Sequence, residues 1–126
     1  MGFFTKKKVV VIIEDDVPLR VFIADKLKEN GVKTIECGDG SKALDVIAEN
    51  SPNCVVLDMM LPGQNGMEIL AELRNVDAKI PVVVLTTLSG AAGLQEEAEK
   101  RNAIFLNKAE VSIEKVLDIV LQAIET

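Results

Sequence analysis

The sequence predicts an α/β fold in which helices cover both faces of a single parallel sheet. Two observations favour it. Short apolar runs alternate five times with longer helical stretches, and charged or turn-forming residues stop those runs. No internal repeat, linker or low-complexity stretch interrupts the 126 residues. Right-handed crossovers then give one doubly wound domain that spans residues 1–126.

Five apolar segments are expected to form the strands. The runs at residues 9–13 and 54–57 are rich in β-branched side chains and too short for a helix. Continuous apolar runs of this length are typical of parallel strands that are buried on both faces. The predicted strands are residues 8–13, 33–37, 54–57, 81–85 and 103–106.

The segments between the strands have helical spacing. Asp16 is expected to cap the first helix, and Gly31 suits its end. The last helix has the clearest amphipathic stripe, whereas the fourth offers few large apolar side chains for burial. The fourth helix is therefore either a weakly anchored, movable element or simply a short solvated helix. The predicted helices are residues 17–30, 41–50, 65–75, 91–101 and 112–125.

Composition excludes several classes of protein. A net charge of −6 with no basic face argues against nucleic-acid binding by this domain. No apolar stretch approaches the roughly 20 residues of a membrane span, and no signal-peptide or myristoylation pattern opens the chain. Cys37 and Cys54 lack metal-type spacing and lie on different predicted strands, too far apart to bridge. We expect reduced core thiols and a cytoplasmic protein.

Carboxylates follow two of the predicted strands. Glu14 and Asp15 come directly after the first strand, and Asp58 comes directly after the third. The carboxyl ends of parallel strands meet at one edge of the sheet, where such folds bind ligands. Close carboxylates repel at roughly 4 kcal/mol per pair at intermediate dielectric, so they call for a hard cation such as Mg²⁺. Helix capping or simple solvation is the alternative for these acids.

Two further polar residues stand at strand ends. Thr86 follows the fourth predicted strand, and Lys108 closely follows the fifth. Near a carboxylate cluster, a hydroxyl can donate to a phosphoryl oxygen and an ammonium can neutralise its charge. Taken singly, Thr86 is an ordinary β-branched residue and Lys108 an ordinary surface lysine.

In this order and spacing, these residues resemble the site of response-regulator receiver domains of two-component systems, of the chemotaxis-regulator type. The resemblance covers essentially the whole chain. It implies a flavodoxin-like fold with a five-stranded parallel sheet in the order 2-1-3-4-5, flanked by five helices. It makes Asp58 the phospho-acceptor, Thr86 the switch hydroxyl and Lys108 the family's lysine.

The chemistry that the resemblance implies is phosphorelay signal transduction. A histidine kinase or histidine phosphotransfer protein would donate a phosphoryl group to Asp58. Mg²⁺ would be held by Asp15, Asp58 and the backbone carbonyl of Met60, with Glu14 acting through water. The domain would catalyse only its own phosphorylation and dephosphorylation, so it is not expected to be an enzyme in the usual sense.

The resemblance also implies a switch. Phe105 occupies the position of the family's rotating aromatic residue, and ordinary core packing is the alternative role. Its inward rotation would remodel the face formed by the fourth helix, fifth strand and fifth helix. The output would be contact with a downstream protein, with the domain monomeric or dimerising on phosphorylation. No partner of the domain is expected to be a nucleic acid or a membrane.

Three departures from the family pattern lead to predictions about the loop after Lys108, the pocket and the lifetime of the phosphate. Ala109 stands where the family usually has a cis-linked proline, so we expect a trans bond and a reshaped loop. Thr87 stands where a smaller residue is usual and is expected to crowd the pocket. Met60 and Leu88 are apolar at positions that tune phosphate lifetime, which predicts slow self-dephosphorylation.

Two alternatives from other classes stay open on the sequence. A pseudo-receiver would use the same fold as a constitutive protein-binding module, and Ala109 favours that reading. An aspartyl phosphatase would need a second acid two residues after the nucleophile, where this chain has Met60. The intact acidic set favours the receiver over both.

Overall fold

A computed structural model describes residues 6–87 and 93–125 of the chain. Its five strands are all parallel and form one sheet in the order β2-β1-β3-β4-β5. The predicted fold class and strand order are therefore confirmed. The strands are β1 (Val9–Ile13), β2 (Lys33–Cys37), β3 (Cys54–Leu57), β4 (Val82–Thr86) and β5 (Ala103–Asn107).

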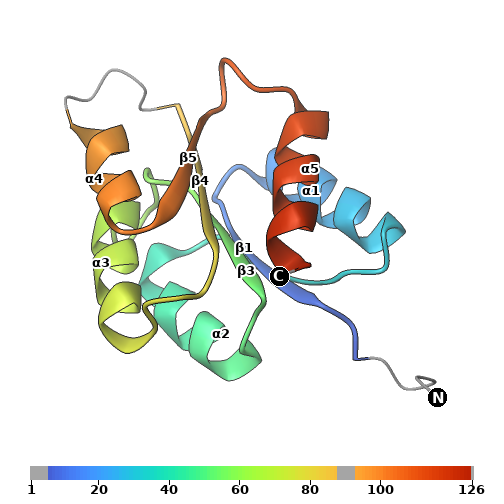
Figure 1. The fold of residues 1–126 in the computed structure, drawn as a ribbon, viewed down its shortest axis with the longest axis horizontal. Helices are drawn as coiled ribbons and strands as arrows, with labels where there is room; N and C mark the ends of the chain where they lie inside the picture. The colour runs from blue at the N-terminus through green and yellow to red at the C-terminus, as the bar shows by residue number, and fades with distance from the viewer. Residues whose placement is uncertain (1–5, 88–92, 126) are drawn as a thin grey trace.

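Helices cover both faces of the sheet. Helices α1 and α5 lie on one face, and α2, α3 and α4 lie on the other (Figure 1). Each strand and helix falls within a few residues of its predicted range, and the second predicted helix opens as a 3₁₀ turn, η1. The helical elements are α1 (Val17–Glu29), η1 (Gly40–Lys42), α2 (Ala43–Asn50), α3 (Gly66–Val76), α4 (Leu94–Lys100) and α5 (Ile113–Ile124).

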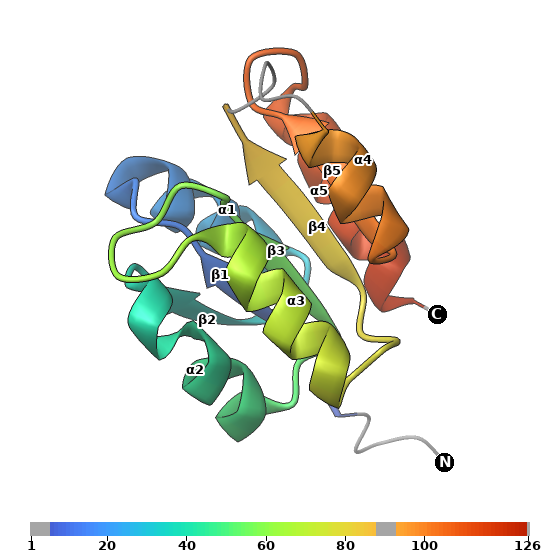
Figure 2. The same ribbon diagram turned by 90° about the vertical axis from the view of Figure 1, so that its left-hand side faces the viewer.

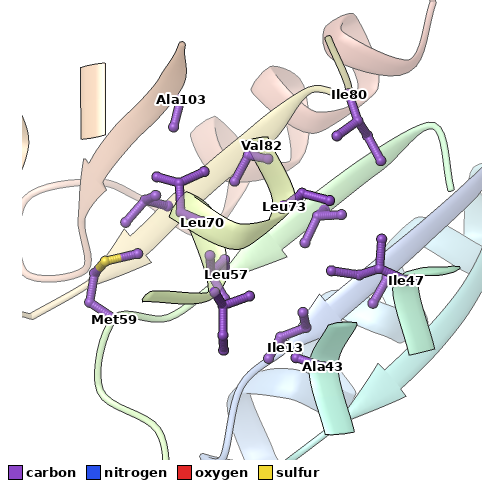
Figure 3. Close-up of a cluster of buried hydrophobic side chains, with 14 of the residues drawn as sticks. Ile13, Ala43, Ile47, Leu57, Met59, Leu70, Leu73, Ile80, Val82 and Ala103 are labelled. Atoms are coloured by element: carbon purple, nitrogen blue, oxygen red, sulfur yellow. The ribbon is translucent and has the colours of Figure 1, made fainter. Parts of the chain in front are cut away.

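The central strands are buried on both faces because successive side chains point to opposite sides of a sheet. On β1, Val11 and Ile13 pack toward α2 and α3, while Val10 and Ile12 pack toward α1 and α5. Figure 3 shows the first of these two clusters, in which Leu57 of β3 lies among side chains from the neighbouring helices. Two aliphatic cores thus hold the sheet between its helical layers.

The helices differ in how firmly they are anchored. Helix α5 buries Val116, Val120 and Ile124, as its amphipathic stripe predicts. Helix α4 buries only Ala98. The predicted start of α4, at residues 91 and 92, lies outside the described residues. The Asp16 side chain accepts a hydrogen bond from the Leu19 backbone amide at 3.2 Å, which confirms the predicted N-cap of α1.

The two cysteines lie on opposite sides of β1. Cys37 is in register with Ile13 and Cys54 with Val10, so the cysteines lie toward different ends of the strands that flank β1. Both are buried free thiols, as predicted. Burial raises the pKa of the Cys54 thiol to about 12, so that sulfur is an inert core group.

Two loops at the carboxyl edge of the sheet are packed against each other through glycines. The Gly40 amide donates to the Pro62 carbonyl at 2.9 Å, and a Cβ at Gly40 would meet the Gln64 backbone. Gly63 has φ +90° and leaves no room for a side chain beside Asp39. The loop that carries Asp58 is thereby braced by the loop that follows β2. None of the helices described is long and apolar enough to cross a membrane.

Candidate functional site

The acidic residues meet at the carboxyl edge of the sheet because the strand ladders continue one residue beyond the strands. The Glu14 amide donates to the Cys37 carbonyl, and the Asp58 amide donates to the Ile13 carbonyl, each at 3.0 Å. Figure 2 shows the β4 arrow pointing to the edge where the loop between β3 and α3 lies. Glu14, Asp15 and Asp58 each present one carboxylate oxygen, and these atoms lie within 4.8 Å of one another.

The three acids differ in their exposure to solvent. The Glu14 and Asp58 side chains are buried, whereas Asp15 is exposed. The Asp58 carboxylate is held at both oxygens: Oδ1 accepts from the Met60 amide at 3.1 Å, and Oδ2 accepts from Lys108 Nζ at 3.0 Å. The backbone of Asp58 is also closely packed, since a Cβ at Gly66 would overlap the Asp58 carbonyl oxygen. Asp58 is therefore held in place next to the solvent-exposed Asp15.

Lys108 joins the two buried acids. Its ammonium lies 2.5 Å from Glu14 Oε1 and 3.0 Å from Asp58 Oδ2. The lysine is placed by β5, which ends at Asn107, and its backbone amide donates to the Thr86 carbonyl at 2.9 Å. Glu14, Asp58 and Lys108, which come from the ends of three different strands, thus form one charged cluster.

Burial governs the ionisation of this cluster. Burial raises the pKa of Glu14 to about 7, and the nearby Asp58 carboxylate adds to that rise, although the Lys108 ammonium opposes it. Burial by itself would lower the pKa of Lys108, but its hydrogen bonds to Glu14 and Asp58 raise the pKa above its usual value. The lysine therefore stays charged throughout the neutral pH range, while Glu14 titrates within it.

The two switch candidates lie on the adjacent strands β4 and β5. Thr86 is the last residue of β4 and is fully buried. The sequence analysis predicted that it would lie just after the strand. It pairs in register with Asn107. Phe105 is partly buried, lies opposite Val84, and packs against the core cluster on the α3 and α4 side of the sheet. Leu88, the second lifetime-tuning position, lies outside the described residues.

The turn after Lys108 is held by hydrogen bonds to Asn107, and it lacks the proline that is usual in the family. The described part of the chain contains no cis peptide bond, so Lys108 and Ala109 are joined in trans, as expected. The Ala109 amide donates to Asn107 Oδ1 at 2.9 Å, and the Glu110 and Val111 amides donate to the Asn107 carbonyl. Sequence reasoning missed Asn107, although an Asn at the end of an apolar strand is a known turn signal.

Sequence reasoning also missed Arg20 of α1. Its Nη1 donates to the Glu14 carbonyl at 2.8 Å, and its Nε donates to Glu36 of β2 at 3.1 Å. No sequence motif connects these positions, because the contact depends on how α1 crosses the sheet. Among the predicted site residues, Phe105 lies in the middle of β5. The acids, Thr86 and Lys108 lie at the carboxyl edge of the sheet.

The oxygen donors at this edge suit a small hard cation. Three carboxylates, one of them exposed, match the partly hydrated sites that Mg²⁺ prefers. Glu14, Asp15 and Asp58 supply only oxygen donors. The residues present therefore fit the ion that the acidic pattern predicts.

Comparison with known proteins assigns the class. The model of the response regulator receiver domain family matches residues 10–120 of the chain. The chain belongs to this family, whose domains serve two-component phosphorelay signalling and interact with histidine kinases or phosphotransfer proteins.

The matches to individual relatives cover different shares of those proteins. Sporulation initiation phosphotransferase F of Bacillus subtilis (strain 168) is 30% identical over 90 residues, which is 71% of this chain and 73% of that protein. DNA-binding response regulator MtrA of Mycolicibacterium smegmatis is 35% identical over 99 residues, which is 75% of this chain but 43% of that protein. The chain thus spans less than half the length of the MtrA relatives that it matches.

Solved receiver domains have the same fold. The receiver domain of Francisella response regulator 1452 superposes with a TM-score of 0.84 at 29% identity, over 94% of this chain and 98% of that one. The BeF3-activated N-terminal receiver domain of Klebsiella pneumoniae RstA gives 0.83 at 28% identity, over 94% of this chain and 100% of that one.

Proposed function

We propose that this domain accepts a phosphoryl group on Asp58 from the phosphohistidine of a histidine kinase or phosphotransfer protein. The observation that carries the proposal is the setting of the Asp58 carboxylate. Both of its oxygens are hydrogen-bonded, to the Met60 amide and to Lys108 Nζ, and two further acids lie beside it. Such a fixed carboxylate at the open edge of an α/β sheet is suited to act as a nucleophile.

The transfer itself requires positioning and charge neutralisation more than covalent chemistry. An Asp58 oxygen attacks phosphorus as the bond from phosphorus to the histidine nitrogen breaks, which leaves an acyl phosphate on the protein. Asp15, Asp58 and the Met60 carbonyl would hold Mg²⁺, with Glu14 acting through water. That ion would neutralise charge on the phosphoryl oxygens. Lys108 supplies the remaining positive charge from the β5 side.

The output would follow from the same contacts. A phosphoryl oxygen on Asp58 competes with the carboxylates for Lys108 and attracts the Thr86 hydroxyl. Lys108 and Thr86 are already joined through their backbones, so a shift of either one is transmitted to β4 and β5. Phe105 and the weakly anchored α4 lie along these strands, and a changed α4, β5 and α5 surface would be read by a partner protein.

The domain would modify only itself. Aspartyl phosphatases turn over because a second acid protonates the leaving group, and the exposed Met60 side chain occupies that place here. With no acid at that position, the acyl phosphate is a state of the protein and not an intermediate in the turnover of a substrate.

Intact-mass measurement after incubation with Mg²⁺ and acetyl phosphate tests the proposal. The wild type should gain one phosphate, and Asp58→Asn should gain none. Asp118→Asn is the matched control, because this aspartate is exposed on α5 and is not one of the clustered acids. Phosphate on Asp58→Asn, or none on the wild type at any Mg²⁺ concentration, would contradict the assignment.

A pseudo-receiver is the second candidate, and one observation favours it. Lys108 already contacts both Glu14 and Asp58, so the protein's own cation neutralises part of the acidic cluster. Such a domain would bind its partner constitutively. Absence of Mg²⁺ binding together with absence of modification would select this function over the first.

A further inference from the structure

We propose that Arg20 is a positioning residue for the acidic site, acting through the backbone of Glu14. The inference rests on the proposed function, because it concerns the affinity of that site for Mg²⁺. Arg20 Nη1 donates to the Glu14 carbonyl at 2.8 Å. This bond fixes the peptide group between Glu14 and Asp15, and therefore the direction in which both acids leave the backbone.

The guanidinium is itself held in place from β2. Arg20 Nε donates to Glu36 Oε1 at 3.1 Å, and the arginine side chain is 17% exposed. The Glu14 amide is meanwhile bonded to the Cys37 carbonyl at the end of β2. The Glu14 backbone is thus fixed on both sides, by β2 at its amide and by α1 at its carbonyl. A planar fork of donors suits this task better than an ammonium does.

Gly38 provides the space that the guanidinium occupies. A Cβ at Gly38 would lie 2.7 Å from Arg20 Nη1 and 3.8 Å from the Glu14 carbonyl oxygen. Gly38 is not among the described glycines with positive φ, so alanine there adds a methyl group without straining the backbone. Replacement of Gly38 therefore displaces the guanidinium while leaving its charge in the protein.

Charge and positioning predict opposite effects, which makes the role testable. A cation close to the acids repels Mg²⁺, so loss of the Arg20 charge alone would strengthen Mg²⁺ binding. Loss of positioning would weaken it, since outer-shell partners of metal ligands change affinity by on the order of tenfold or more. The direction of the change therefore separates the two roles.

The experiment is calorimetric titration of the purified 126-residue chain with MgCl₂. We expect Arg20→Gln and Gly38→Ala each to weaken Mg²⁺ affinity by on the order of tenfold. The double variant should be little weaker than either single variant, because both remove the same hydrogen bond. Circular dichroism and thermal unfolding confirm that each variant is folded at the titration temperature.

A control separates the bond to Glu14 from the loss of a positive charge on α1. Lys26→Gln removes a cation from α1 whose contacts are with Glu29 and Phe22. It should bind Mg²⁺ within about twofold of the wild type, since exposed charges are screened.

The outcomes are distinct. Unchanged or tighter Mg²⁺ binding by Arg20→Gln overturns the positioning role, and so do additive effects in the double variant. A wild type that binds no Mg²⁺ overturns the proposed function and this inference together. A wild type that binds Mg²⁺ beside unaffected variants overturns the inference alone.

Discussion

Glu14 combines three properties: it is buried, it contacts a lysine, and it lies beside a second acid. Its side chain accepts from Lys108 and also from the Asp16 amide. Burial outweighs these bonds, so the pKa rises from its ordinary value of 4.5 to about 7. The protonation of one residue therefore makes the stability of the metal-free protein sensitive to neutral pH.

We expect the stability of the metal-free wild type to fall, relative to Glu14→Gln, as pH rises from about 4.5 to 7. Between these values the folded state holds a proton that the unfolded state has lost, so Glu14 favours folding at low pH and this advantage disappears above its folded pKa. The difference is on the order of 1–3 kcal/mol, at about 1.4 kcal/mol per pKa unit. Urea unfolding of both proteins at several pH values measures it.

The composition makes this pH dependence easy to assign. The chain has no histidine, the side chain that ordinarily titrates in this range. Lys108 has a raised pKa and remains charged across the same window, so its own contribution is constant there. Parallel stability curves for the two proteins between pH 5 and 7.5 would show that Glu14 ionises at an ordinary carboxylate pKa.

At the scale of elements, the turn between β5 and α5 is the clearest departure of this chain from its family. Asn107 organises the turn by accepting from the Ala109 amide with its side chain and from the Glu110 and Val111 amides with its carbonyl. The turn therefore uses the very amide that a proline at position 109 would lack. Lys108 reaches the acids from this trans turn.

Ala109→Pro is consequently expected to destabilise this domain, even though it restores the residue usual in the family. The substitution removes the donor to Asn107 Oδ1 and leaves a partly buried acceptor unsatisfied, at a cost of about 1–3 kcal/mol. Urea unfolding of the single variants and of Ala109→Pro with Asn107→Ala measures the coupling. Because both changes break one hydrogen bond, their effects should be less than additive. A stabilised Ala109→Pro would show that the turn readily adopts the family's conformation.

At the scale of the whole molecule, the fold was predictable because the aliphatic strands are short and the helices long. Short apolar runs alternating with stretches of helical spacing indicated where the strands and helices lie. The acids at the strand ends indicated which edge of the sheet carries the site. The strand order came from the resemblance to receiver domains, since periodicity carries no information on which strands are neighbours.

The parts that were missed depend on contacts between distant residues. Arg20 and Glu36, for example, are 16 residues apart, and no periodic pattern links them. Whether such side chains meet depends on how helices cross the sheet and which rotamers they adopt. The turn at η1 was missed for a different reason: three residues are too few to show a period.

The position of the proposed Mg²⁺ site would make ion binding depend on the whole fold. Its acids follow β1 and β3, and its lysine follows β5, so an ion there joins segments that unfolding separates. A ligand that binds only the folded state stabilises it by about 2.7 kcal/mol at one hundred times its dissociation constant. We therefore expect Mg²⁺ to raise the unfolding temperature of the wild type well beyond the effect of NaCl at equal ionic strength. Asp15→Asn should lose most of this gain, whereas Asp118→Asn should keep it. Differential scanning calorimetry measures all three proteins, and equal shifts with both salts would mean that Mg²⁺ only screens the net charge of −6.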